Sequence, residues 1–436
     1  MLWPVAEPPS HLAARRGEAQ GPLPHPESFV LFADERSHVS KPAETLGSGG
    51  AQRAPQMLAM ILAAGATWAS SASADSSLTR EVHRTFPAPK EVILENLAGQ
   101  VAIGRSKDKQ VEVTAVIHAA GATASEAEAL LKALDFTFDT VGDRLQVRGD
   151  YPTDRYQVYR YPPIDPEGHS TSQSTYDNKR IMVTSKDERG AVTLYADVTI
   201  GLPPGVEVRV TEMAGEMAVT GVESDVRLEN GWGNISVKDS HGHLKAETGS
   251  GDVQITGQKG DIDVGTGSGH IMAEDITGLA NLGTGSGDVT AARIKGNVSI
   301  DTGSGDVEAR SITGTIAIDT GSGDALITDA KAERLAVDTG SGMIRVESPA
   351  IFRSSPGAEA LLETGSGDVV LTIDSQVSMT LDFESGSGKV KSPRTLEGRI
   401  EKIGREGSRR YKIGSGDSQV RVETGAGDVV LVMAEH

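Results

Sequence analysis

The chain has 436 residues, a formal net charge of −19, 51 glycines, no cysteine and only 4% aromatic residues. The negative charge argues against a nucleic-acid partner because phosphates would be repelled, and the absence of cysteine excludes a disulfide framework. The shortage of large side chains favours an interior of Val, Ile, Leu, Ala and Thr, which suits narrow stacked strands.

The first 74 residues divide into two segments. Residues 1–56 are rich in Pro, Gly, Ala and polar residues without a clear period, and we expect a disordered leader or a mis-called start. Residues 57–74 have an apolar run, then small residues that end in Ala72-Ser-Ala74, and this pattern predicts a signal peptide. The run is too short to span a bilayer. The alternative is a short buried helix. A signal peptide implies export to the periplasm or cell surface of a bacterium, with no membrane span.

Residues 75–210 are expected to form an N-terminal cap with the first rungs of a repeat structure. Val92 to Ile103 has the pattern of a first rung. Thr123 to Leu134 predicts one helix, with Thr123 as N-cap and Glu126 at the capping-box position. Because the ends of repeat structures need covering, we expect this helix to cover the first rung. Alternating residues predict further strands within Gln110–Ile117, Phe136–Val147 and Ile181–Ile200.

A long loop is expected at residues 151–179, where prolines interrupt the strand pattern. It holds five of the seven tyrosines of the chain: Tyr151, Tyr156, Tyr159, Tyr161 and Tyr176. Exposed tyrosines suit the recognition of sugars or peptides, so these residues form a candidate ligand-binding site. The alternative is a loop that folds back and buries its rings.

Residues 211–436 carry an internal repeat. Thr-Gly-Ser-Gly begins at Thr248, Thr266, Thr284, Thr302 and Thr320, which are 18 residues apart, and recurs with variation to the C-terminus. Within one unit two short alternating strands flank a Gly303-Ser-Gly305 turn, where we expect glycine to supply a positive φ. The pattern predicts an all-β fold, a single-stranded β-helix (β-solenoid) with 18-residue rungs and right-handed crossovers.

Leu-Pro-Pro-Gly at residues 202–205, followed by Val206-Glu-Val-Arg-Val and serial Thr-Gly-Ser-Gly-Asp-Val units, resembles the bacterial putative-adhesin family of β-strand repeats. The resemblance covers about residues 92–432. It implies a single-stranded right-handed β-helix and brings no established catalytic residues, since the function of the family is unknown.

Carboxylates recur at two positions of the repeat. Asp288, Asp306 and Asp324 follow the glycine turn, and Asp301 and Asp319 precede its threonine. Stacked rungs would place like charges about 5 Å apart, which a bound Ca²⁺ would relieve. The sequence therefore offers a cation ladder. The alternative is that each aspartate accepts hydrogen bonds from the backbone of its own turn.

The chain ends in an apolar strand with no capping helix after it. We expect residues 429–433 to leave an open strand edge, which would allow end-to-end homo-association or the addition of a partner strand.

No nucleophile–base pair and no phosphate-binding loop is found in the sequence. We therefore expect a non-enzymatic cell-envelope scaffold or adhesin-like binding protein, without a cofactor, whose partner is a protein or glycan of the cell envelope. Two alternatives remain: a calcium-stabilised repeat protein, and a polysaccharide-active β-helix enzyme.

Overall fold

A computed structural model describes residues 76–162, 171–186, 188–353, 357–403 and 409–434. All of these residues lie in one compact unit. The leader and signal peptide expected at residues 1–74 lie outside the described residues. In the described part, no helix is both long and apolar enough to cross a membrane.

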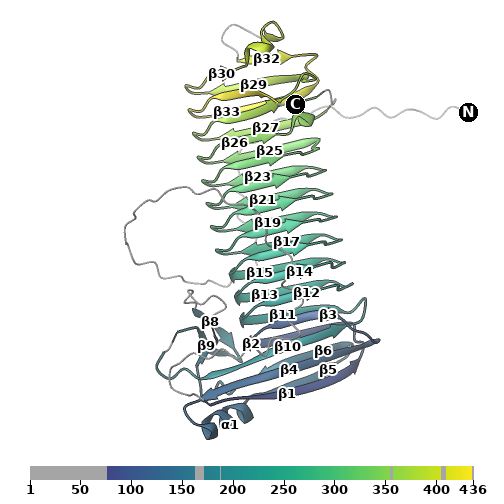
Figure 1. Cartoon of the computed structure of the whole chain (residues 1–436), viewed down its shortest axis with the longest axis vertical. Helices are drawn as coiled ribbons and strands as arrows, with labels where there is room; N and C mark the ends of the chain where they lie inside the picture. Colours follow the sequence, from purple (N-terminus) through teal and green to yellow (C-terminus); the bar gives the residue numbers. More distant parts are fainter. Residues whose placement is uncertain (1–75, 163–170, 187, 354–356, 404–408, 435–436) are drawn as a thin grey trace, which may run out of the picture. The chain divides into compact units, whose positions relative to one another are not determined.

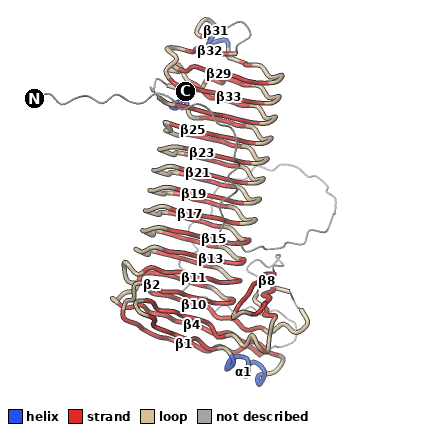
Figure 2. Tube along the Cα trace, turned by 180° about the vertical axis from the view of Figure 1, so that it is seen from behind, coloured by secondary structure: helices blue, strands red, loops and turns tan. Residues whose placement is uncertain are grey.

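The described residues form two long sheets and a small third sheet (Figures 1 and 2). The first sheet has fifteen strands in the order β1 (Ser76–Pro87), β4 (Gln110–Gly121), β10 (Thr193–Leu202), β3 (Val101–Arg105), β12 (Met217–Thr220), β14 (Ile235–Lys238), β16 (Val253–Thr256), β18 (Ile271–Glu274), β20 (Val289–Ala292), β22 (Val307–Arg310), β24 (Ala325–Thr328), β26 (Ile344–Glu347), β28 (Val369–Ile373), β34 (Val429–Met433) and β30 (Val390–Lys391). We call it sheet A.

Sheet B has sixteen strands in the order β31 (Ile400–Ile403), β32 (Arg410–Ile413), β29 (Met379–Ser385), β33 (Ser418–Thr424), β27 (Glu359–Thr364), β25 (Arg334–Thr339), β23 (Ile316–Thr320), β21 (Val298–Thr302), β19 (Ala280–Thr284), β17 (Ile262–Thr266), β15 (Leu244–Ser250), β13 (Val226–Trp232), β11 (Glu207–Ala214), β2 (Glu91–Ala98), β6 (Arg144–Asp150) and β5 (Asp135–Val141). Sheet C contains β7 (Val158–Arg160), β9 (Lys179–Thr184) and β8 (Thr171–Tyr176). Two short 3-10 helices span Pro349–Phe352 and Arg394–Leu396.

Each rung contributes one strand to sheet B and the next strand to sheet A. In β21 the side chains of Val298, Ile300 and Thr302 are buried, whereas Ser299 and Asp301 are exposed, as the alternation of the sequence predicts. Val298 pairs in parallel with Ile316 of the following rung. The buried side chains of the two sheets belong to one continuous hydrophobic core. The architecture is an all-β stack of rungs consistent with a β-solenoid.

The positive φ expected in the Gly303-Ser-Gly305 turn is wrong. Neither Gly303 nor Gly305 has a positive φ. A Cβ atom on Gly305 would instead lie 1.8 Å from the carbonyl oxygen of Gly287, one rung earlier. Glycine is needed here because the backbones of successive turns approach too closely for a side chain.

At the N-terminal end, β2 and β3 form the first rung, as predicted, and pair in parallel with β11 and β12. Helix α1 (Ala124–Ala133) begins after Thr123, whose Oγ1 accepts the Glu126 backbone N–H at 3.2 Å, so the predicted N-cap is confirmed. The helix packs on β1 and β4, which pair antiparallel at the end of sheet A. The expectation that it covers the first rung is therefore wrong.

At the C-terminal end, the order of rungs in space differs from the order in the chain. Strands β33 and β34, residues 418–434, form a rung that lies between β27–β28 and β29–β30 (Figure 1). The predicted open edge at residues 429–433 is therefore only partly wrong: β30 pairs with Val429 and Val430, and among the described residues no strand pairs with residues 431–433 on that side. The edge strand of sheet A is β30, which has two residues, and an antiparallel pair, β31 and β32, ends sheet B.

Candidate functional site

The tyrosine segment does not present an exposed aromatic surface. Tyr151, Tyr159, Tyr161 and Tyr176 are all at most 8% exposed, and only Tyr156 is partly exposed. Tyr151 meets Tyr159 and Tyr176 edge-on, with ring centroids 5.5 Å and 5.9 Å away. Sheet C, built mostly from this segment, packs on β10, β11 and β13. The expected exposure of these rings is wrong for four of the five, because they fill the contact between sheet C and the first rungs.

Two hydroxyl groups of this cluster, those of Tyr151 and Tyr176, bind the backbone and side chains of the solenoid, whereas the buried Tyr159 hydroxyl has no partner among the described residues. Tyr151 donates to Asn96 Oδ1 at 2.9 Å, and Tyr176 donates to the carbonyl oxygen of Gly149 at 2.6 Å. Burial raises the pKa of the Tyr151 phenol well above its usual value. These phenols therefore stay protonated and act as structural donors.

A ladder of buried polar side chains runs through the turns of sheet B. In the repeats it consists of threonines: Thr320 Oγ1 donates to the carbonyl oxygen of Gly305 at 3.1 Å and accepts the N–H of Gly323 at 3.1 Å. From Thr266 onward, each threonine of the ladder therefore joins one rung to the next and also closes its own turn. Sequence alternation placed these threonines inside but did not reveal this double role.

In the first rungs the same ladder position is held by Asn96, Glu212 and Asn230, which pair in register with one another and with Thr248. Glu212 is 3% exposed; its Oε1 accepts from Asn96 Nδ2 at 2.7 Å, and its Oε2 has no partner among the described residues. Burial raises the pKa of the Glu212 carboxyl well above its usual value. The signal in the sequence is the alignment of the irregular early units with the later threonines.

The five aspartates of the expected cation ladder lie in two separate columns. Asp288, Asp306 and Asp324 follow the turns that lead into sheet A, whereas Asp301 and Asp319 lie on the outer face of sheet B. Among the described residues, no three His, Cys, Asp or Glu side chains are grouped closely enough to hold a metal ion.

Each carboxylate of the first column accepts a hydrogen bond from a backbone N–H. Asp288 Oδ1 accepts the backbone N–H of Asp306 at 2.9 Å, and Asp306 Oδ1 accepts that of Asp324 at 2.8 Å. His270 takes the same role through Nδ1, which accepts the Asp288 N–H at 3.0 Å. The sequence offered the alternative that each aspartate accepts hydrogen bonds from its own turn. This is wrong, because the N–H that each aspartate accepts belongs to the next rung.

The second column belongs to a longer row of carboxylates on sheet B. Six acidic residues pair in register on successive rungs; we call them the acidic row: Asp301, Asp319, Asp338, Glu363, Glu423 and Glu384. Arg421 forms ion pairs with Glu423 at 2.6 Å and Glu384 at 3.5 Å. Within the described residues the first four have no ion-pair partner. Neighbouring strands lie about 4.8 Å apart, so this part of the row is a line of uncompensated negative charge.

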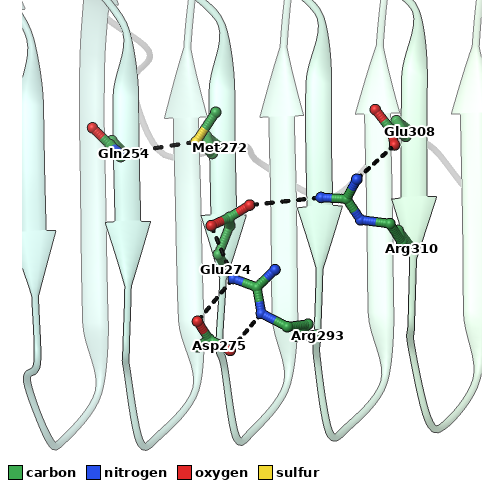
Figure 3. A network of polar contacts seen from close by, with 7 residues as sticks. All are labelled: Gln254, Met272, Glu274, Asp275, Arg293, Glu308 and Arg310. Carbon is green, nitrogen blue, oxygen red and sulfur yellow. Dashed lines mark hydrogen bonds and ion pairs between the residues drawn. The ribbon is translucent and has the colours of Figure 1, made fainter. Parts of the chain in front are cut away.

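On the outer face of sheet A, acidic side chains form ion pairs with arginines (Figure 3). Arg293 contacts Asp275 at 2.7 Å and Glu274 at 2.9 Å, and Arg310 lies 3.3 Å from Glu308. The pairs of Arg293 cross from one rung to the next, whereas Arg310 and Glu308 lie on the same strand, β22. The two faces of the solenoid therefore differ in charge: sheet A carries paired charges here, and sheet B carries the acidic row.

Two open grooves lie on these outer faces. The groove on sheet A, of about 480 Å³, is lined by the first aspartate column together with Leu326, Met343 and Arg345. The groove on sheet B, of about 530 Å³, lies at the end of the acidic row and is lined by Asp338, Glu363, Glu384 and Glu423 with the neighbouring glycine turns.

Residues 257–431 match the model of the Toastrack DUF4097 family, so most of the repeats are similar to a family of unknown function. A comparison with curated proteins finds no match. Among solved structures, the chain is similar to a putative cell adhesion protein from Clostridium sporogenes, with 10% identity, a TM-score of 0.16, and coverage of 83% of this chain and 100% of that one. It is also similar to a putative adhesin from Bacteroides fragilis (11% identity, TM-score 0.27, coverage 81% and 97%). A third is a putative lipid binding protein from Parabacteroides distasonis (13%, 0.27, 82% and 96%).

Proposed function

We propose that the chain is a non-enzymatic, adhesin-like scaffold of the bacterial cell envelope that binds a protein or glycan on the outer face of sheet B. The observation that carries this proposal is the acidic row, in which Asp301, Asp319, Asp338 and Glu363 lie on successive rungs without an ion-pair partner among the described residues. Such a row repels itself, and a partner with cationic groups at a similar repeat would relieve the repulsion.

The finer features of the proposal come from the sequence. Export rests on the signal-like residues 57–74, and residues 75–210 act as a cap for the repeats of residues 211–436. We expect the coil to be right-handed, as parallel crossovers generally are, and the Thr-Gly-Ser-Gly-Asp-Val units to be the signature that this chain shares with its family.

Neither alternative function gains support from a particular contact. For a calcium-stabilised protein, several carboxylates would need to converge on one point, and in the part of the chain that the structure describes no three acidic side chains do so. For a polysaccharide-active enzyme, the groove on sheet B would need one general acid and one base in distinct surroundings, and its four carboxylates occupy one repeated position on neighbouring strands.

Co-sedimentation with isolated envelopes of the producing bacterium tests the proposal. We expect the purified chain to sediment with them, and the triple variant Asp319→Asn, Asp338→Asn, Glu363→Gln to bind at least about tenfold more weakly, as expected for the loss of about 1.4 kcal/mol. The matched control removes the same number of charges from sheet A through Glu274→Gln, Asp275→Asn and Glu308→Gln, and should bind as the wild type does.

Two results would contradict the proposal: a wild-type chain that stays in the supernatant, or equal binding by both triple variants. Release of reducing ends from acidic glycans by the purified chain would instead make it an enzyme.

A further inference from the structure

The C-terminal rung, residues 418–434, is held on both sides by residues that precede it in the chain. On one side β33 and β34 pair in parallel with β27 and β28. On the other side they pair in parallel with β29 and β30. We call residues 374–417, which connect β28 to β33, the cap segment. Its strands β29 and β30 pair with the far side of the C-terminal rung, although they precede that rung in the chain. The structure describes residues 374–403 and 409–417 of this segment.

This order of strands constrains how the C-terminal rung folds into place. The C-terminal rung can enter only while the cap segment stands away from β27 and β28, because the strands of the cap segment and those of β27 and β28 pair with opposite edges of the rung. We call the space between β27–β28 and β29–β30 the slot. At that stage the slot is open, and the C-terminal rung is not yet paired with its neighbours. Every backbone group that the slot offers is the same in each copy of the chain.

The slot recognises this rung by charge as well as by backbone pairing. Lys391 of the cap segment contacts Asp428 at 2.5 Å, and Asp428 Oδ1 accepts the backbone N–H of Lys389 at 2.8 Å. Arg421 of the rung reaches Glu384 of the cap segment at 3.5 Å. A rung with the same sequence satisfies all of these contacts, so a second copy of this chain is the partner that fits.

A short turn is the direct link between the C-terminal rung and its own cap. Ile413 and Ser418 both pair with Met379, from opposite sides of β29, so residues 414–417 cross over the end of that strand. Gly414 and Gly416 have φ of +65° and +77°, and a Cβ on Gly414 would lie 2.5 Å from the carbonyl oxygen of Val377. The closed form thus depends on two glycines in a tight turn. Although Gly414-Ser-Gly-Asp has the sequence of a repeat turn, it is a crossing connection.

We propose that residues 418–434 are exchanged between two copies of this chain, so that the cap segment of each copy closes over the C-terminal rung of the other. The exchanged dimer keeps the strand pairs and ion pairs of the monomer and differs mainly in the 414–417 turn, which opens to reach the partner. It joins two solenoids at their C-terminal ends, and Glu423 in the acidic row of each copy then comes from the other copy.

Cysteine cross-linking tests the exchange, since the chain has no cysteine of its own. Leu361 of β27 and Arg421 of β33 are exposed and pair in register on neighbouring strands, about 4.8 Å apart, within the range that a disulfide spans. The double variant Leu361→Cys, Arg421→Cys establishes that the bond forms. A second pair, Glu363→Cys with Glu423→Cys, does the same if the first is strained.

The exchange itself is measured by refolding a mixture of two full-length single variants, Leu361→Cys and Arg421→Cys, which carry different tags. We expect a disulfide between the two chains whose yield rises with protein concentration. The matched control mixes Ala317→Cys with Ala336→Cys, which pair in register on internal rungs and should give no such bond. Absence of the bond between Leu361→Cys and Arg421→Cys chains, when the double variant forms it, would overturn the proposal, and so would equal yields from the control pair.

The turn provides an independent test. Replacing Gly414 and Gly416 by alanine strains the closed turn but not an opened one, so we expect the dimer fraction of Gly414→Ala, Gly416→Ala to rise severalfold over the wild type in light scattering. A variant that remains monomeric at every concentration contradicts the exchange.

Discussion

At the turns of the solenoid, carbonyl oxygens of one rung lie where side chains of the next rung would begin. Gly305 illustrates this, since its hypothetical Cβ lies 1.8 Å from the oxygen of Gly287. Gly283 is different: it lies in β19, has no positive φ, and its nearest neighbour would be the oxygen of Val264 at 3.9 Å. Two glycines of one repeat array therefore have different reasons to be glycine.

We expect Gly305→Ala to lower the free energy of unfolding by about 1–3 kcal/mol, because a backbone carbonyl must move to admit the methyl group. Gly283→Ala should change it by less than about 1 kcal/mol, in either direction. Urea unfolding followed by circular dichroism measures both variants. Equal losses in the two variants would show that close approach at the turn is not the reason for glycine.

The sequence could not separate these reasons. Glycine in a turn motif predicts a positive φ, and here the requirement is the distance between rungs, which depends on stacking. The aspartates after the turns gave a similar difficulty: the motif suggested a hydrogen bond within one turn, whereas Asp288 Oδ1 reaches the N–H of Asp306 in the next. Contacts between rungs are encoded 18 residues away and are hidden when one unit is read alone.

At the scale of a strand, β11 carries one buried ionisable group. Glu212 lies between Asn96 and Asn230 on the ladder, and the groups whose electrostatic interactions reach it include Asp197, Tyr151 and Tyr161, none of them cationic. Its carboxyl pKa in the folded chain lies above the ordinary value of 4.5 because burial disfavours the charged form. The stabilisation that depends on its proton is therefore complete below pH 4.5 and decreases as the pH rises through the folded-state pKa.

We expect Glu212→Gln to remove this decrease. A glutamine amide needs no proton at this position and can donate to a carbonyl oxygen, as Asn230 Nδ2 does to Gly215 at 2.7 Å. Measured as the difference in unfolding free energy between variant and wild type, the advantage of the variant should grow by about 1.4 kcal/mol per pH unit above pH 4.5, until the folded-state pKa is reached. A difference that is independent of pH would mean that Glu212 is ionised in the folded chain.

The positions of strands in the sequence were easier to predict than which strands pair with one another. The alternation in Val298–Thr302 and the helix signal at Thr123 depend on local residues, and both are confirmed. The position of β33 beside β27 is not local: β29 and β33 both present an apolar inner face, so periodicity alone cannot decide which of them follows β27. The burial of Tyr159 likewise depends on where sheet C packs, which no sequence period records.

At the scale of the whole molecule, the net charge of −19 and the acidic row both destabilise the folded chain through repulsion between like charges. Added salt screens both, so raising NaCl from about 10 mM to about 0.5 M should raise the midpoint of thermal unfolding. Asp319→Asn should stabilise the chain by up to about 1 kcal/mol at low salt and by less at high salt. Asp263→Asn is the control, since Asp263 already has Lys245 at 3.5 Å and should gain nothing.

Calcium separates screening from binding in the same experiment. At matched ionic strength we expect Ca²⁺ and Mg²⁺ to give the same midpoint, and a chelator to leave it unchanged. A midpoint that rises only with Ca²⁺ would restore the calcium-stabilised alternative.

The placement of β34 also affects how the chain resists force. A processive unfoldase that grips the C-terminus would have to pull β34 away from β28 along its whole length and from β30 at Val429 and Val430, which breaks hydrogen bonds on both of its edges. Strand β1 at the other end has a single neighbour, β4, and can be peeled away one bond after another. The solenoid should therefore be mechanically polar, resistant when pulled from its C-terminus and weaker when pulled from its N-terminal strand.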